Sequence, residues 1–201
     1  MNRTRFQKAL FAFAAGALLA AGQALATATV GEPAPNFSLK ALDGKTYSLA
    51  DFKGKTVVLE WINPNCPFSA RQANDGVMTG VVKKHPEVVW LAINSTNPSH
   101  QDHLSNEEHL AWNKKHGVAY PVLLDGSGSV GHLYEAKSTP HMFIIDKQGK
   151  VAYNGAIDDD PRGSKAVAAR VNYVDGGLVA ELAGKSPDPA TTRSYGCSIK
   201  Y

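Results

Sequence analysis

The sequence has only two cysteines, and only one long apolar run interrupts its 201 residues. That run lies within residues 1–26, where three basic residues precede the apolar stretch 9–21 and small residues lead up to Ala26. This order is typical of a secretory signal peptide, and the run is shorter than the about 20 residues that a membrane-spanning helix needs. We therefore expect cleavage after Ala26, a periplasmic or secreted protein, and no membrane association after signal removal. A retained membrane anchor is the alternative.

The sequence also lacks a surplus of either charge once residues 1–26 are set aside. Three of the 21 Lys and Arg residues lie in that segment, which leaves 18 basic residues against 18 acidic ones. A balanced composition without a basic run argues against nucleic acid and anionic membranes as partners. The chain that follows Ala26 is long enough to bury roughly 70% of its unfolded surface in one domain.

No internal repeat or linker divides this part of the chain. We expect one domain over residues 27–184 and a tail over residues 185–201. Short alternating segments on either side of Asp43-Gly44 predict a β-hairpin. The pattern predicts further strands at 56–59, 88–93, 121–124, 142–145 and 151–157, and helices at 67–84, 105–116, 130–135 and 164–182. Strands that alternate with helices before a closing antiparallel hairpin predict an α/β sheet with helices on both faces.

Cys66 follows the strand predicted at 56–59 and precedes Pro67, a residue favoured at the first position of a helix. A helix N-terminus presents unpaired N–H groups and a partial positive charge, and both favour a thiolate. Such placement lowers the pKa of a cysteine from about 8.5 into a range of about 3.5–7.5. The alternative is a buried cysteine that acts as a small apolar side chain, but the neighbouring Asn65 and Pro67 favour the reactive interpretation.

Several segments together resemble a known family. They lie at residues 30–39, 43–45, 49–55, 60–68 and 138–146, and the tail segment 195–201 is similar to that of exported redoxin-domain proteins. The family is the alkyl hydroperoxide reductase and thiol-specific antioxidant group of the thioredoxin-like redoxins. The resemblance covers most of the chain after Ala26, and its motifs are specific as a set and weak singly. It implies a thioredoxin-like fold: a central mixed β-sheet with helices on both faces and an N-terminal β-hairpin extension.

The resemblance implies roles for a small set of residues. Cys66 matches the attacking cysteine, and Glu60 matches the buried acid beneath the thioredoxin active site, where burial would raise its pKa and let it exchange protons with a sulfur. Thr139-Pro140 matches the cis-proline loop that faces this cysteine. The alternatives are an ordinary ion pair for Glu60 and a trans turn at Pro140.

The departures from the family patterns bear on the type of activity. Thioredoxins have a second cysteine three residues after the first, and this sequence has Ser69 there. Peroxiredoxins have Pro and Thr or Ser at the positions of Leu59 and Asn63. No arginine is clearly assigned to their catalytic one: Arg71 is a candidate, and a solvated helix residue is the alternative for it. Peroxidase activity is therefore supported by kinship and not by motif.

Cys197 is the only other cysteine, and it lies in a tail that contains Pro and Gly. We expect it to act as the resolving cysteine, which closes a bridge with Cys66 after Cys66 has reacted. The alternative is a permanent disulfide that pins the tail, worth about 5 kcal/mol in the chain-entropy model.

The sequence thus predicts an exported thiol-dependent oxidoreductase, antioxidant or peroxidase-like, that acts on a peroxide or a protein disulfide and is regenerated by a thiol reductant. Thiol–disulfide exchange without peroxidase activity is one alternative. Another is a copper-carrying protein of the same fold, in which Cys66 and His141 would meet. A third is a non-catalytic binding protein of this fold with a structural disulfide. We predict no cofactor and no metal, since copper carriers need two neighbouring cysteines. The stretch Asp158–Asp160 is expected to be a solvated loop.

Overall fold

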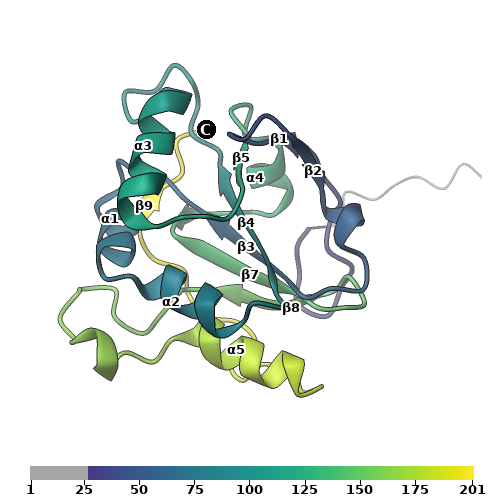
Figure 1. Ribbon diagram of the computed structural model, residues 1–201. Helices are drawn as coiled ribbons and strands as arrows, with labels where there is room; N and C mark the ends of the chain where they lie inside the picture. Colours follow the sequence, from purple (N-terminus) through teal and green to yellow (C-terminus); the bar gives the residue numbers. More distant parts are fainter. Residues whose placement is uncertain (1–26) are drawn as a thin grey trace, which may run out of the picture.

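The computed structural model describes residues 27–201, so the predicted signal peptide lies outside the described residues. A five-stranded sheet runs through the centre of the molecule in the order β5-β4-β3-β7-β8 (Figure 1). Strands β3, β4 and β5 are parallel, and β7 and β8 are antiparallel to their neighbours, which confirms the predicted mixed sheet. The strands are β3 (Val57–Trp61), β4 (Val89–Asn94), β5 (Val122–Leu124), β7 (His141–Ile145) and β8 (Val151–Gly155).

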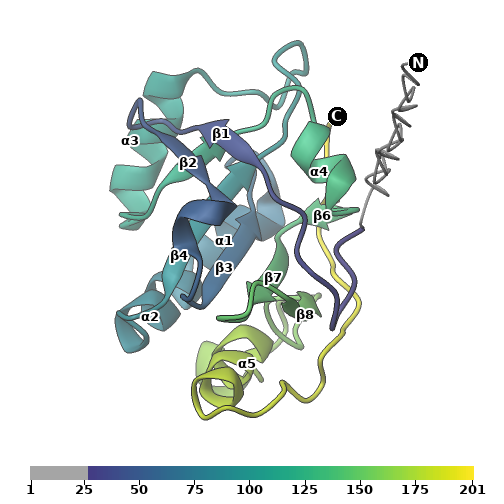
Figure 2. The ribbon, with the colours of Figure 1, turned by 90° about the vertical axis from the view of Figure 1, so that its right-hand side faces the viewer.

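Both faces of the sheet are covered, because β3 is apolar at every position except Glu60 and sends alternate side chains to opposite sides. Leu59 and Trp61 join one buried cluster, and Val58 joins the other. The predicted hairpin and α4 cover the first face, and four helices cover the second (Figure 2). These elements are β1 (Ser38–Lys40), β2 (Thr46–Ser48), η1 (Leu49–Phe52) and α4 (Ser129–Leu133), then α1 (Pro67–Asn74), α2 (Val77–Lys84), α3 (Asn106–His116) and α5 (Tyr173–Leu182).

Two helix predictions need correction. The segment 67–84 forms two helices, since Gly76 adopts a left-handed φ of 64° between them. The helix predicted at 164–182 begins only at Tyr173, and residues 164–172 form a loop with one short turn, η2 (Val167–Ala169). Asn172 caps α5 by accepting a hydrogen bond from the Asp175 N–H at 2.9 Å, a start signal that the sequence prediction missed.

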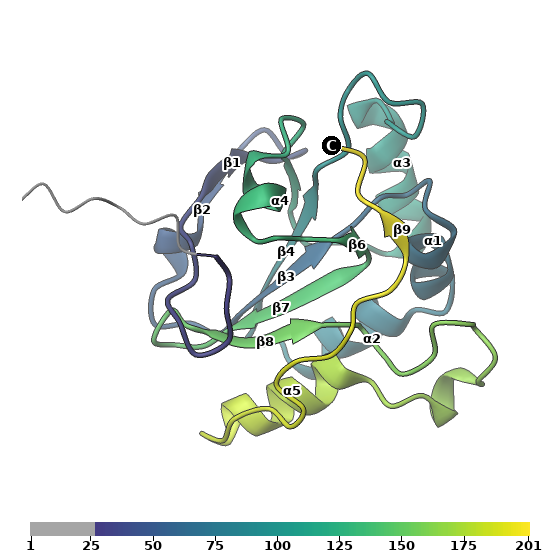
Figure 3. The ribbon, with the colours of Figure 1, turned by 180° about the vertical axis from the view of Figure 1, so that it is seen from behind.

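The tail is bound along the domain over its whole length. It leaves the end of α5, follows the outer edge of β8, and then passes β6 (Ser138–Thr139) toward α4 (Figure 3). The Asn154 N–H donates to the Ala190 carbonyl at 3.1 Å, and the Thr192 N–H donates back to the Asn154 carbonyl at 3.1 Å. Farther along, β9 (Cys197–Ser198) pairs antiparallel with β6. Among residues 27–201, no helix has the length and apolarity required to cross a membrane.

Candidate functional site

Cys66 occupies the position predicted for it, at the start of a helix. It is the N-cap residue of α1, Pro67 takes the first helical position, and the Ala70 N–H donates to the Cys66 carbonyl at 2.9 Å. The preceding turn is held by Asn63, whose amide donates to the Thr96 hydroxyl at 3.0 Å and whose Oδ1 accepts from the Asn65 N–H at 2.8 Å. The end of β3 and the start of α1 therefore deliver this sulfur to the helix N-terminus.

The loop before β7 and the tail meet at Cys66. The Thr139–Pro140 peptide bond is cis, as the resemblance implied. Thr139 pairs with Cys197 across the β6–β9 ladder, and its carbonyl accepts a hydrogen bond from the Cys66 thiol at 3.0 Å. Gly196 lies so close to this loop that a Cβ built on it would collide with the Thr139 carbonyl. The predicted residues Cys66, Thr139, Pro140 and Cys197 thus form one cluster.

The two cysteines are free thiols that influence each other's pKa, and they differ in burial. Cys66 is 2% exposed, whereas Cys197 is partly exposed. Burial acts against ionisation of Cys66, but hydrogen bonds from the Cys197 and Thr139 side chains and from the Ser69 N–H outweigh it and lower the pKa of the Cys66 thiol. Burial and the proximity of Cys66 raise the pKa of Cys197 to about 11. Cys66 is therefore the more acidic thiol of the pair.

Glu60 lies in the middle strand of the sheet, and no basic side chain within residues 27–201 pairs with it. It is 4% exposed, and its neighbours across the ladders are Ala92 and Met142. Burial raises the pKa of Glu60 to about 7, although the Tyr120 hydroxyl donates to its carboxylate at 2.8 Å and acts in the opposite direction. The alternative of an ordinary ion pair is excluded, and the carboxyl group can change its proton occupancy near neutral pH.

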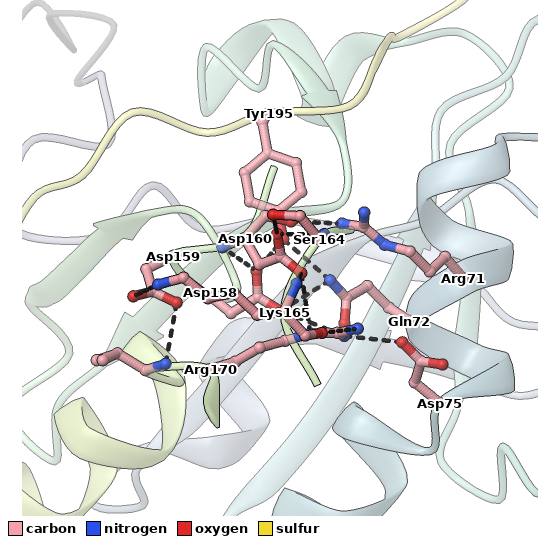
Figure 4. Close-up of polar contacts among 11 residues, drawn as sticks. Arg71, Gln72, Asp75, Asp158, Asp159, Asp160, Ser164, Lys165, Arg170 and Tyr195 are labelled. Carbon is pink, nitrogen blue, oxygen red and sulfur yellow. Dashed lines mark hydrogen bonds and ion pairs between the residues drawn. The ribbon is translucent and has the colours of Figure 1, made fainter. Parts of the chain in front are cut away.

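A buried polar network ties the helix that carries Cys66 to the tail that carries Cys197 (Figure 4). The Gln72 amide of α1 donates to the Asp158 carboxylate at 3.0 Å and to the Tyr195 hydroxyl at 2.9 Å. Tyr195 in turn donates to Asp158 through a short hydrogen bond. The Arg71 guanidinium lies 5.9 Å from the centre of the Tyr195 ring and donates to the Asp160 carbonyl at 2.8 Å, so it is not directed at Cys66 as a peroxidatic arginine would be.

The expectation of a solvated acidic loop at 158–160 is wrong. Asp158 and Asp160 are almost completely buried. The Arg170 guanidinium lies 3.2 Å from the Asp160 carboxylate, 3.8 Å from that of Asp158, and 2.8 Å from that of Asp75 in the turn after α1. Arg170 turns inward and balances these buried charges. The path of the loop 164–172 is set by these contacts, and the segment does not form a helix.

The remaining candidates are part of the framework. His141 is buried, with Nδ1 accepting from the Lys137 N–H at 3.1 Å and Nε2 lying 2.8 Å from Asn154 Oδ1. Burial lowers the pKa of His141 to about 4, so the ring is neutral and both nitrogens are engaged within the protein. In the part of the chain that the structure describes, no three His, Cys, Asp or Glu side chains converge as metal ligands would.

Sequence reasoning missed three residues that complete the site: Gly196, Tyr195 and Arg170. Gly196 precedes the cysteine and allows the close approach to Thr139. Its only signal in the sequence is the Tyr-Gly-Cys order, and that order alone does not indicate a close backbone approach. Nothing in the local pattern indicates the distant partners of Tyr195 and Arg170.

The fold and the cysteine at a helix N-terminus opposite a cis-proline loop define a redoxin of the thioredoxin-like class. Residues 30–154 match the AhpC/TSA family, and the chain belongs to that family. The match includes Cys66, Glu60 and the cis-proline loop, and it ends before the tail with Cys197.

Three individual proteins are similar to this chain at 28% to 30% sequence identity. The protein named thiol-disulfide oxidoreductase ResA of Bacillus thuringiensis subsp. konkukian is 30% identical over 126 residues, which cover 61% of this chain and 66% of that protein, just under two thirds of its length. A hypothetical protein from Sinorhizobium meliloti 1021 superposes with a TM-score of 0.75 at 28% identity over 86% of this chain and 94% of that one. An uncharacterised conserved protein from Geobacillus kaustophilus gives 0.76 at 28% identity, covering 87% and 93%. The last two similarities therefore extend over most of the described residues.

The raised pKa of Glu60 predicts a pH-dependent stability. Its folded-state pKa lies above its unfolded value, so the contribution to stability is full below about pH 4 and is lost as the pH rises through 7. Between pH 4 and pH 8, the free energy of unfolding of the wild type should fall by about 3 kcal/mol more than that of Glu60→Gln. Denaturant unfolding across this range measures both. Tyr120→Phe removes the opposing hydrogen bond and should extend the loss to higher pH, whereas equal pH dependence in wild type and Glu60→Gln would contradict the assignment.

The close packing of Gly196 predicts that Gly196→Ala separates β9 from β6, because the new methyl group meets the Thr139 carbonyl and φ is +137°. Cys66 should then react at least about tenfold faster with an uncharged thiol reagent, measured at high pH where its thiolate fraction is constant. Gly80→Ala is the matched control, since that helical position has open space around it. An unchanged rate in Gly196→Ala would show that β9 does not shield Cys66.

Proposed function

We propose that this protein catalyses thiol–disulfide exchange on protein substrates, with Cys66 as the attacking thiolate and Cys197 as its resolving partner. The observation that supports the proposal best is the convergence of both cysteines on Thr139: the Cys66 thiol, which has a lowered pKa and lies at a helix N-terminus, donates to its carbonyl, and Cys197 pairs with it across the β6–β9 ladder. The thiolate is the nucleophile in exchange reactions, and Cys66 is the more acidic thiol of the pair because its pKa is lowered while that of Cys197 is raised.

The proposed cycle moves two electrons from the cysteine pair to the substrate disulfide. The Cys66 thiolate attacks one sulfur of the substrate, a mixed disulfide forms, and the first substrate thiolate leaves. Cys197 then loses its proton and attacks the Cys66 sulfur, which closes the 66–197 bridge and releases the second substrate thiolate. An external dithiol reductant restores both cysteines and becomes a disulfide itself.

Glu60 and the cis-proline loop have supporting roles in this proposal. The high pKa of Cys197 means that it must lose a proton before it can attack, and Glu60, with a pKa of about 7, has the affinity needed for a proton acceptor near neutral pH. Thr139 supplies a carbonyl to the Cys66 thiol while it is protonated. We assign Thr139 and Pro140 to the positioning of the sulfur.

Peroxide is the second substrate class that the family membership suggests, but the site geometry does not favour it. The side chain at the position of the peroxidatic hydroxyl is Asn63, which holds the turn before Cys66. Arg71 is engaged by the Asp160 carbonyl and two aromatic rings. We further propose that residues 1–26 direct export and that the protein acts in the periplasm or outside the cell, where disulfide substrates persist.

Exchange by this pair predicts distinct products for the two cysteine variants. With glutathione disulfide at pH 7, Cys197→Ser should accumulate a stable mixed disulfide on Cys66, because no second sulfur resolves it. Cys66→Ser should react at least about tenfold more slowly, because burial, the largest cause of the raised pKa of Cys197, remains when the contribution of Cys66 is removed. Intact-mass and peptide analysis follow both products. Equal reactivity of the two variants would refute the assignment of Cys66 as the thiolate.

The preference for disulfides over peroxides is tested by rapid mixing of the reduced wild type with hydrogen peroxide. We expect Cys66 to consume peroxide no more than about tenfold faster than free cysteine at an equal thiolate concentration, since Asn63 replaces the peroxidatic hydroxyl and Arg71 is engaged by the Asp160 carbonyl. Cys66→Ser provides the background rate. A rate several orders of magnitude higher would establish a peroxidase instead.

A further inference from the structure

Beyond Cys197, the tail packs closely against α4 through Tyr201. The Tyr201 ring stacks on the His132 ring with 4.0 Å between centroids and 27° between planes. Its hydroxyl donates to the Ala136 carbonyl at 2.8 Å. Gly128 and Gly131 face the ring, and a Cβ on either glycine would overlap with it. We call this set of His132, Ala136, Gly128 and Gly131 the tyrosine seat.

Each residue between Cys197 and Tyr201 contacts the rest of the domain. Ser198 pairs with Ser138 of β6, and Ile199 packs against the apolar cluster on the α4 face of the sheet. The Lys200 carbonyl accepts from the Asn97 N–H at 2.7 Å. The contacts of the tail thus continue to the tyrosine seat, and the backbone of this segment can be followed past β9 toward α4 in Figure 3.

Contacts therefore flank Cys197 on both sides. Upstream, Tyr195 is bound by Gln72 and Asp158 (Figure 4), and downstream Tyr201 is bound by the seat. The first set of contacts reaches α1, which carries Cys66, and the second reaches α4 on the opposite face of the sheet. With only one of the two in place, the residues around Cys197 could pivot away from Cys66.

We propose that Tyr201 is a positioning residue for the redox pair, and that its seat on α4 holds Cys197 close to Cys66. The bridge can then close without a prior movement of the tail toward Cys66. This inference rests on the proposed exchange function. A sulfur held in place has a high effective concentration toward its partner, because the entropy of bringing the two together is already lost on folding. Loosening the seat restores that entropy cost and makes the 66–197 bridge easier to reduce.

The test compares the equilibrium of the 66–197 bridge with glutathione redox buffers in four variants. Tyr201→Ala removes the ring, and Gly131→Ala fills the seat while leaving the tail sequence intact. Alanine is a better helix former than glycine, so Gly131→Ala does not weaken α4 itself. Tyr201→Phe keeps the stacked ring and loses one hydrogen bond. Gly176→Ala, a helical glycine with open space around it, is the matched control.

We expect Tyr201→Ala and Gly131→Ala each to lower the equilibrium constant for bridge formation by about tenfold or more, which corresponds to a rise of about 30 mV in reduction potential. Tyr201→Phe should lie closer to the wild type, and Gly176→Ala should be indistinguishable from it. The rate of bridge closure after Cys66 has formed a mixed disulfide should fall in the same order.

A purely structural role gives a different result. If Tyr201→Ala and Gly131→Ala lower the melting temperature but leave the equilibrium constant and the closure rate unchanged, the positioning role is refuted. Gly131→Ala decides the matter if Tyr201→Ala does not fold. Failure of the wild type to form any 66–197 bridge would refute the proposed function instead, and the mass of the oxidised protein, lower by two hydrogens when the bridge forms, separates the two failures.

Discussion

The pairing of β6 with β9 is the contact on which the proposed site depends. It places Cys197 beside Thr139, whose carbonyl already accepts a hydrogen bond from Cys66. The two strands can approach this closely only because Gly196 has no side chain to meet that carbonyl. Three segments that are distant in the sequence thereby meet at Cys66. Without this ladder, the chain would contain one cysteine at a helix start and another at an unrelated place on the surface.

The same pairing controls the chemistry of Cys66 in two opposing ways. The tail covers the sulfur, and burial disfavours its charged form. The tail also brings the Cys197 thiol, a hydrogen-bond donor that favours that form. Because donation to an anion is stronger than donation to a neutral acceptor, the hydrogen bonds prevail and the pKa of Cys66 is lowered. A single structural element thus limits access to the thiolate and stabilises it.

The local sequence pattern was sufficient to predict much of the fold and half of the site. The apolar run at β3 predicted a central strand, and Pro67 after Cys66 predicted a helix start, since both signals depend on neighbours in sequence. The cis-proline loop and Glu60 followed from resemblance. The docking of the tail depends on contacts across the whole domain, which no local pattern records. The helix predicted at 164–182 failed for the same reason, because distant carboxylates draw Arg170 inward.

The buried network between α1 and the tail is better explained by its effect on the relative position of these elements than by a contribution to the free energy of folding. Burying Arg170 among three carboxylates carries a desolvation penalty that offsets much of the Coulomb attraction, so an apolar cluster of equal volume would hold the loop as well. Apolar contacts, however, tolerate sliding, whereas charged groups with fixed hydrogen-bond directions allow one register. We interpret the network as the device that sets the register between α1 and Tyr195. Since Cys66 begins that helix and Cys197 follows that tyrosine by two residues, the register between these elements fixes the relative position of the two sulfurs.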